Sequence, residues 1–245
     1  MTLRLGDLSG DDRYKAWRGV IERIYREQVQ QAWNHYLFRL LRAVFVTNPR
    51  LSEEGGFVFQ WMVENYVDAA LMLLRRELDQ QAGTENLRNL LFDMIQHPTV
   101  LTRARYRAAW GPQGVFEKQQ AERSFDTFNP KLVDGDGDHI DPAIVKSDLD
   151  QVVASAERLR EYAERTRAHR TPERNVDTAS ITFAAMHEAL TDVRGVVAKY
   201  YALLTLDIVG QWEPVPQYDT LDAFMRPWVV DRTAVAEALK ERGGQ

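Results

Sequence analysis

The chain has 245 residues, of which 44% are hydrophobic and 27% are charged, so it can form one large or two small domains with a sizeable core. Its formal net charge of −5 argues against tight, non-specific binding of nucleic acid by the whole surface, but not against a local basic site. The lack of cysteine excludes disulfides and zinc–thiolate sites and is typical of a reducing compartment. No signal-peptide pattern opens the chain, and the longest apolar run, residues 69–74, is too short for a bilayer, so we expect a cytoplasmic protein without membrane contact.

Apolar residues recur at steps of three and four along most of the chain, which is the pattern of amphipathic helices. In the first half of the sequence this pattern predicts five helices, at residues 12–46, 52–78, 84–95, 98–110 and 114–128. The third is predicted to be capped by Thr84 and the fourth to begin at Pro98, since a hydroxyl caps the first turn and proline fits there. Trp17, Trp33, Trp61 and Tyr66 lie on apolar faces and are predicted to be core residues.

Residues 129–142 form the main irregular segment and include an acidic run from Asp134 to Asp141. Its spacing is superficially like that of a calcium loop, which needs glycine at its sixth position and glutamate at its twelfth. These positions hold His139 and Val145, so we expect an acidic loop that does not bind calcium.

Two further long helices are predicted after this loop. The first begins at Asp141–Pro142 or at Ser147 and ends near Ala168, and the second is capped at Asp177–Thr178 and runs to Gly210. Long periodic helices joined by mostly short loops indicate an all-α, up-and-down bundle over residues 12–210. Residues 211–245 are predicted to be a proline-containing linker followed by a short helical appendage.

The sequence between residues 158 and 174 is unusually basic, with six arginines and three glutamates, and a local charge of +3. The arginines are Arg158, Arg160, Arg165, Arg167, Arg170 and Arg174. His169 lies among them, and histidine is the side chain that changes charge near neutral pH. Arginine binds phosphate through paired hydrogen bonds, so the set suits phosphodiester chemistry. The alternative is structural: basic side chains also stabilise helix C-termini and pair with glutamate on solvated faces.

A second basic group, Arg103, Arg105 and Arg107, allows the same two interpretations. The sequence has no glycine-rich phosphate loop, no His-Glu-x-x-His and no Gly-x-Ser-x-Gly, and no histidine and carboxylate spacing that predicts a metal site. No cofactor is therefore expected.

The helix that runs into Ala168-His169-Arg170, followed by a capped helix ending in Lys199-Tyr200-Tyr201-Ala202-Leu203-Leu204, resembles the HEPN superfamily, and in particular its abortive-infection U-type branch. The resemblance extends over about residues 33–204, and its sequence-bearing part is confined to residues 159–204. It implies a helical bundle, homodimerisation, a cognate partner protein and, in active members, metal-independent RNA cleavage in a prokaryotic defence or toxin–antitoxin system.

The family motif places an arginine four to six residues before a histidine. His169 matches the histidine, whereas Arg165 is one residue too close and Arg160 is too far away. The resemblance thus implies His169 as the acid–base residue, Arg165 as the residue that stabilises charge on the phosphate, and Arg160, Arg167 and Arg170 as RNA or phosphate contacts. The alternative function is a catalytically inactive interaction or nucleic-acid-binding module with the same fold.

Overall fold

The computed structural model describes residues 8–81, 83–111, 115–129, 138–162 and 182–216, together with positions 219, 220, 222 and 233. Across these residues the regular structure is helical, and the only β-type pairing is an isolated bridge between Thr102 and His139. The predicted all-α class is therefore confirmed. None of the helices in these ranges is long and apolar enough to cross a membrane.

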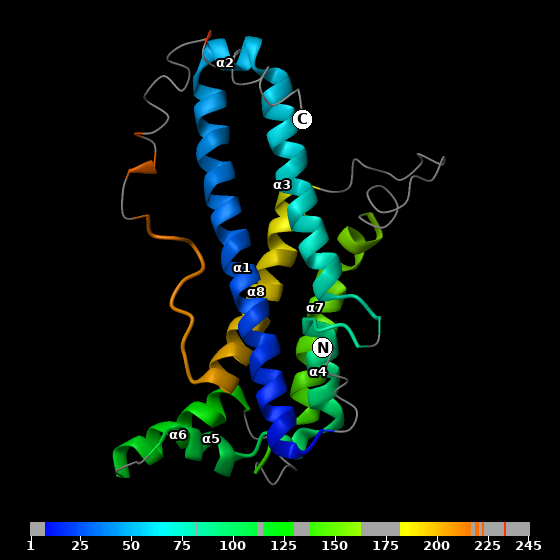
Figure 1. The fold of residues 1–245 in the computed structure, drawn as a ribbon, viewed down its shortest axis with the longest axis vertical. Coiled ribbons are helices and arrows are strands. Elements are labelled where there is room, and N and C mark those ends of the chain that lie inside the picture. Colours follow the sequence, from blue (N-terminus) through cyan, green and yellow to red (C-terminus); the bar gives the residue numbers. More distant parts are fainter. Residues whose placement is uncertain are drawn as a thin grey trace.

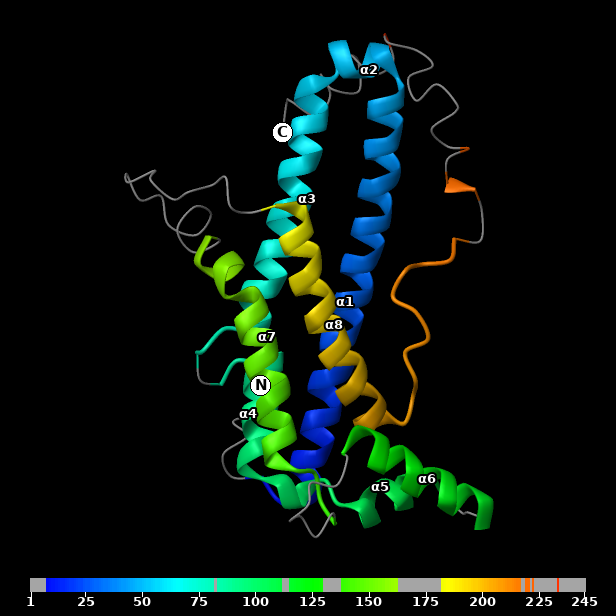
Figure 2. The same ribbon diagram turned by 180° about the vertical axis from the view of Figure 1, so that it is seen from behind.

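Five helices form an up-and-down bundle with four columns (Figures 1 and 2). They are α1 (Gly10–Thr47), α3 (Gly56–Glu77), α4 (Leu87–Gln96), α7 (Pro142–Tyr162) and α8 (Phe183–Thr205). α1 and α7 run in one direction, while α8 and the successive helices α3 and α4 run in the other. α3 and α4 thus make one column, interrupted by the turn at residues 78–86. Helix α5 (Arg103–Ala109) and helix α6 (Val115–Phe128) form a smaller pair at the base of the bundle.

The core lies where these columns meet, in the lower part of the molecule as drawn in Figure 1. α1 contributes Trp17, Ile21 and Ile24, which follow one another at helical spacing and are 0–1% exposed. Leu71, Leu74, Leu90, Leu91, Val152, Val193 and Tyr200 meet them from the other columns. Burial of these apolar faces is what holds the columns together.

Several helix ends differ from the sequence prediction. The helix predicted at residues 52–78 is divided into α2 (Pro49–Glu54) and α3, because the chain turns at Gly55. A Cβ at Gly55 would lie 2.5 Å from the carbonyl oxygen of Leu51, so a larger residue does not fit this turn. The cap of α4 is Asn86 rather than Thr84: the Asn86 side chain accepts a hydrogen bond from the backbone N–H of Asn89 at 2.8 Å.

The fourth and last predicted helices also begin later than expected. Residues Pro98–Val100 form a single 3₁₀ turn, and α5 starts after Thr102, whose side chain accepts from the backbone of Arg105. α8 is capped by Thr182 instead of residues 177–178 and ends at Leu206, which adopts a left-handed conformation with φ of 68°, rather than at Gly210. In both helices the threonine hydroxyl that caps the first turn lies closer to the apolar stripe than the predicted start does.

The C-terminal part of α1 and the N-terminal part of α3 extend beyond the first turn of α8 and are joined by α2 (Figure 1). We call this two-helix extension the arm. Four large apolar side chains of this arm are exposed: Val46, Phe57, Val58 and Trp61. The prediction that Trp61 is a core residue is therefore wrong, since 58% of its surface is exposed, and Trp33 is 37% exposed. Trp17 and Tyr66 are buried as predicted. Helical periodicity identified the apolar faces, but in the arm no described third column covers them.

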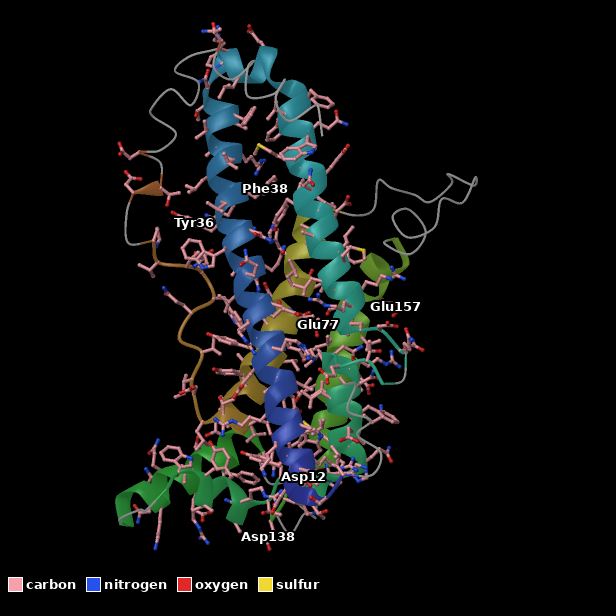
Figure 3. All side chains as sticks on the ribbon, viewed as in Figure 1. Asp12, Tyr36, Phe38, Glu77, Asp138 and Glu157 are labelled. Carbon is pink, nitrogen blue, oxygen red and sulfur yellow. The ribbon has the colours of Figure 1, made fainter. Side chains whose placement is uncertain are left out.

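The chain after α8 returns along α1. Trp212 packs on Tyr25, Glu213 pairs with Arg39 at 3.0 Å, and Thr220 accepts a hydrogen bond from the hydroxyl of Tyr36 at 3.4 Å. Tyr36 and Phe38 leave α1 on different sides, so that Tyr36 meets this segment while Phe38 stacks on Tyr66 of α3 (Figure 3). One side of α1 is thus covered by the returning segment and the other by the bundle.

Candidate functional site

The residues with the strongest sequence-based case lie outside the described part of the chain. Arg165, Arg167, His169 and Arg170 belong to residues 163–181, and of Arg160 only the backbone is described, near the end of α7. The structure does describe the two helix ends between which this segment lies. α7 and α8 pack against each other as neighbouring antiparallel columns, and the C-terminal end of α7 and the N-terminal end of α8 lie at a similar level of the bundle (Figures 1 and 2).

The second basic group is structural. Arg103 bonds to Glu122 at 2.9 Å and to Asp126 at 2.6 Å, and Arg107 bonds to Glu122 at 3.2 Å. Arg105 pairs with Asp11 and also donates to the carbonyl oxygens of Gly10 and Val100. These arginines therefore fasten α5 to α6 and to the start of α1. The structural interpretation of this group is correct, although its pairs join different elements rather than neighbouring turns of one helix.

A cluster of histidine, tyrosine and arginine lies where α1, α3 and α8 meet. His35 of α1 and His187 of α8 have their ring centroids 4.1 Å apart. The Nδ1 atom of His35 is 2.9 Å from the hydroxyl oxygen of Tyr66 on α3, so the two groups share a hydrogen bond. Both histidines are half-buried, whereas Tyr66 is buried. His187 is in the second turn of α8, close to where residues 163–181 join that helix.

The surroundings of this cluster lower the pKa of both imidazoles and so disfavour their charged form. Burial, and then the basic groups of His187, Arg39 and Arg194, lower the pKa of His35 to about 4. Burial and the two arginines lower the pKa of His187 as well. Burial raises the pKa of the Tyr66 hydroxyl to about 12, so it remains a proton donor. The lowered pKa also makes the His35 imidazole a weak proton acceptor near neutral pH, because an effective general base has a pKa close to the working pH.

Arg194 of α8 gives the cluster its positive charge. Its guanidinium Nε and Nη2 atoms are buried and have no hydrogen-bonding partner among the described residues. Burial lowers the pKa of Arg194, and the interactions with Tyr66 and Glu213 partly offset this decrease. A guanidinium nevertheless stays charged in proteins, and buried charge is costly unless it is paired. These two guanidinium nitrogens therefore favour an acceptor or anionic group nearby.

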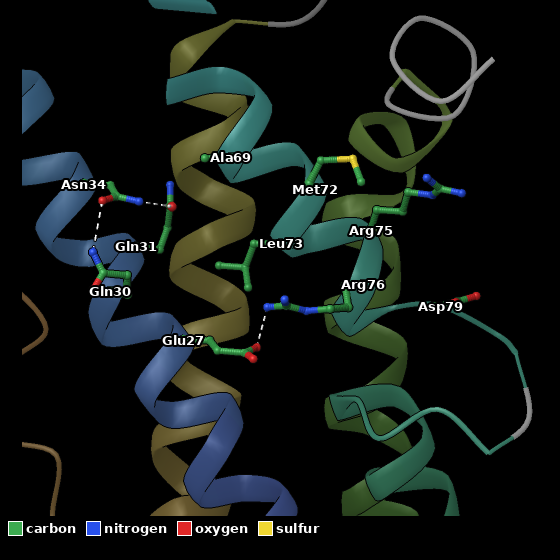
Figure 4. Close-up of a pocket in the computed structure, with 10 residues that line it drawn as sticks. All are labelled: Glu27, Gln30, Gln31, Asn34, Ala69, Met72, Leu73, Arg75, Arg76 and Asp79. Atoms are coloured by element: carbon green, nitrogen blue, oxygen red, sulfur yellow. Dashed lines mark hydrogen bonds and ion pairs between the residues drawn. The ribbon is translucent and has the colours of Figure 1, made fainter. Parts of the chain in front are cut away.

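A cleft of about 580 Å³ lies between α1 and α3, one turn further down α1 (Figure 4). Its α1 wall carries Glu27, Gln30, Gln31 and Asn34, and its α3 side carries Ala69, Met72, Leu73, Arg75, Arg76 and Asp79. Glu27 pairs with Arg76 across the lower end of the cleft. Gln31 lies one helical turn before His35 on the same face of α1, so the cleft adjoins the histidine cluster.

A buried carboxyl group lies beside the lower end of this cleft. Glu77 is 1% exposed, lies between the columns of the bundle (Figure 3), and accepts a hydrogen bond from the backbone N–H of Leu87 at 3.1 Å. Burial raises the pKa of Glu77 to about 7, and the neighbouring Glu27 adds to this, whereas the Leu87 N–H and Arg76 oppose it. Glu77 therefore links α3 to the first turn of α4 through this hydrogen bond. Its carboxyl group is expected to titrate near neutral pH.

Glu77 is expected to make stability depend on pH. Because its pKa is higher in the folded than in the unfolded chain, the folded state binds the extra proton between about pH 4.5 and 7. The free energy of unfolding should thus rise as the pH falls from 7 to 4.5, by on the order of 3 kcal/mol for a shift of this size. Urea denaturation at pH 5 and pH 8 should show this dependence in the native chain and much less in Glu77→Gln.

Glutamine keeps an acceptor for the Leu87 N–H but does not titrate, so the substitution isolates the charge. Glu64→Gln, at an exposed position of the same helix, is the matched control and should leave the pH dependence unchanged. Equal pH dependence in the native chain and in Glu77→Gln would contradict this assignment.

The histidine cluster was not predicted, because in the sequence His169 is the histidine that lies among arginines. A signal for it was present: His35 lies on the same helical stripe as Gln31 and Phe38, and His187 on that of Phe183 and Leu190. Polar residues on otherwise apolar stripes indicate a buried polar site. Which stripes face each other, however, depends on the tertiary packing.

No protein-family model, curated protein or solved structure shows a significant match to this chain. Within the described ranges, no group of three or more histidine, aspartate or glutamate side chains is arranged to hold a metal ion.

Proposed function

We propose that this protein is a HEPN-like prokaryotic defence or toxin–antitoxin-type protein that acts on RNA as a metal-independent endoribonuclease. The observation that carries the proposal is the polar cluster where α1, α3 and α8 meet. His35, His187, Arg39 and Arg194 act on one another where α1, α3 and α8 meet, and in the sequence the segment that precedes α8 carries the arginines around His169. Both sets of residues suit the approach of a phosphate backbone.

The reaction needs few groups from the protein. The 2′-hydroxyl of RNA loses its proton to a base and its oxygen attacks the phosphorus atom, while the bond from phosphorus to the 5′-oxygen breaks and that oxygen gains a proton. The products are a 2′,3′-cyclic phosphate and a 5′-hydroxyl. His169 is proposed to transfer the protons, and Arg165, with Arg167 or Arg170, to stabilise the charge on the phosphate. Arg194 and Arg39 attract the adjoining RNA.

The test is an assay of purified protein with unpaired RNA in the presence of a chelator. The expected result is cleavage, with fragments that end in a cyclic phosphate. An intact substrate under these conditions, with a folded protein, would overturn the enzymatic proposal.

A second candidate is a catalytically inactive HEPN-like module that binds a partner protein or nucleic acid. The exposed apolar arm favours it, because contiguous apolar surface on a protein commonly marks an interaction site. In this case the chelator assay would show no cleavage, while a gel-shift experiment with the same RNA or isolation of a stable complex would show binding.

We further propose that the chain forms a homodimer through this arm. Light scattering at micromolar concentration should give twice the monomer mass of 28.3 kDa. Replacing both Phe57 and Trp61 with serine should shift the protein to the monomer, because these side chains are 82% and 58% exposed in the single chain. Phe92→Ser, at a comparably exposed position on α4, is the control and should remain dimeric. A native chain that is monomeric would exclude this assembly, and a dimeric double variant would exclude the arm as its interface.

A further inference from the structure

The cleft between α1 and α3 has two walls of different chemistry (Figure 4). On the α1 wall three amide side chains form a chain: Gln30 Nε2 donates to Asn34 Oδ1, and Asn34 Nδ2 donates to Gln31 Oε1, each at 3.3 Å. Gln31 is 3% exposed and anchors the row, whereas Asn34 is half-buried and Gln30 is exposed. Amide hydrogen bonds of this length are weaker than those near 2.9 Å, so a ligand can replace them at small cost.

The facing wall is apolar where it lies opposite the amides. Ala69, Met72 and Leu73 line it, and Met72 is 46% exposed although it lies beside the cleft. A methionine thioether makes favourable contacts with aromatic rings. A flat ligand could therefore place one face on this wall and its hydrogen-bonding edge against the amides.

The charges of the lining favour a neutral ligand. Glu27 and Asp79 balance Arg75 and Arg76, and Glu27 is already paired with Arg76. Anionic ligands need an excess of donors and positive charge, which this cleft does not offer. Positive charge and unpaired donors lie instead at the cluster of His35 and Arg194, one turn further along α1.

We propose that the α1–α3 cleft binds a nucleobase, with adenine preferred, as the base-recognition site of the RNA substrate. The proposal rests on the proposed action on RNA. Unpaired RNA bases are bound through their edges and ring faces, and asparagine and glutamine amides pair with the donor–acceptor edge of adenine. The cleft volume of about 580 Å³ is within the range of small-ligand sites. The backbone of a bound nucleotide would then pass the positively charged cluster.

The direct experiment is an NMR titration of the full-length protein with adenosine, guanosine, cytidine and uridine. Adenosine is expected to bind most tightly, with a Kd on the order of 0.1 mM for a ligand of this size. Asn34→Leu should weaken adenosine binding about tenfold or more, since it removes the paired hydrogen bonds at similar side-chain volume. Met72→Ala should weaken it as well, and because Met72 is exposed this change should leave the fold intact.

Asn65→Leu is the matched control, because Asn65 is an exposed asparagine of α3 outside the cleft and should leave the Kd unchanged. Single-stranded RNA containing adenine should compete with adenosine, whereas the same sequence in a duplex should not. This comparison separates a base within RNA from a free nucleoside as the natural ligand.

Failure of this inference is distinguishable from failure of the proposed function. If no nucleoside binds, or if Asn34→Leu and Met72→Ala bind adenosine like the native chain, the cleft assignment is overturned even where RNA is cleaved. If adenosine binds as expected while RNA remains intact, the cleft assignment stands and the endoribonuclease proposal falls.

Discussion

Replacing His169 with alanine is expected to lower the rate of RNA cleavage by about 10²–10⁴-fold, because the variant loses the side chain proposed to transfer protons. Folding should be almost unaffected, since the sequence predicts His169 at a helix C-terminus, where a histidine contributes only about 0.3–1 kcal/mol through the helix dipole. The measurement is cleavage of unpaired RNA in chelator, with circular dichroism to confirm the fold. His139→Ala, beside α5, is the control and should cleave like the native chain.

The arginine variants test the rest of the site. Arg165→Ala should abolish cleavage if Arg165 takes the role of the displaced motif arginine, and Arg165→Lys should restore only part of it, because an ammonium lacks the planar fork of a guanidinium. Arg160→Ala should have a smaller effect. If His169→Ala cleaves as fast as the native chain, the acid–base assignment is wrong, and His187→Ala then tests whether the α1–α3–α8 cluster supplies the base instead.

The fold class could be predicted from sequence because helical periodicity is a local property. The stripe through Trp17, Ile21 and Ile24 shows which face of α1 is apolar, and the structure buries that face. Periodicity does not show whether another element covers a given turn. Trp61 is on such a stripe but lies in the arm, beyond the first turn of α8, and is therefore exposed.

The histidine cluster of α1, α3 and α8 could not be predicted from the sequence, for a related reason. The basic segment around His169 is contiguous in sequence and so was recognised there. The pairing of His35 with His187, and of Gln31 with the α3 wall, depends on the register between helices that are far apart in the chain. Sequence periodicity places each residue on its own helix but does not fix that register.

A buried ion pair joins the first turn of α1 to α4. Asp93 of α4 accepts from Arg13 Nη1 at 2.7 Å and from the indole Nε1 of Trp17 at 2.7 Å. The side chains of Arg13 and Asp93 are only 5% and 14% exposed. One carboxylate thus holds the first turns of α1 against α4, where Trp17 is fully buried in the core.

Asp93→Ala is expected to lower the free energy of unfolding by about 3–5 kcal/mol, because it leaves a buried guanidinium without this carboxylate and the buried indole N–H without its acceptor. Such a loss is a large part of the total stability of an ordinary domain. Urea denaturation at constant pH measures it. Asp93→Asn should cost less, since its amide oxygen can still accept one of the two hydrogen bonds.

Asp150→Ala is the matched control, because Asp150 pairs with Lys146 on the exposed surface of α7 and should cost no more than about 1 kcal/mol. A double-mutant cycle separates the ion pair from the loss of packing: Arg13→Met together with Asp93→Ala should be less destabilising than the sum of the two single changes. An additive double variant, or a loss from Asp93→Ala no larger than that of Asp150→Ala, would show that this contact does not stabilise the α1–α4 interface. A large coupling energy would instead identify it as the polar contact that fixes the register of α1 on α4, and hence the position of the cleft further along α1.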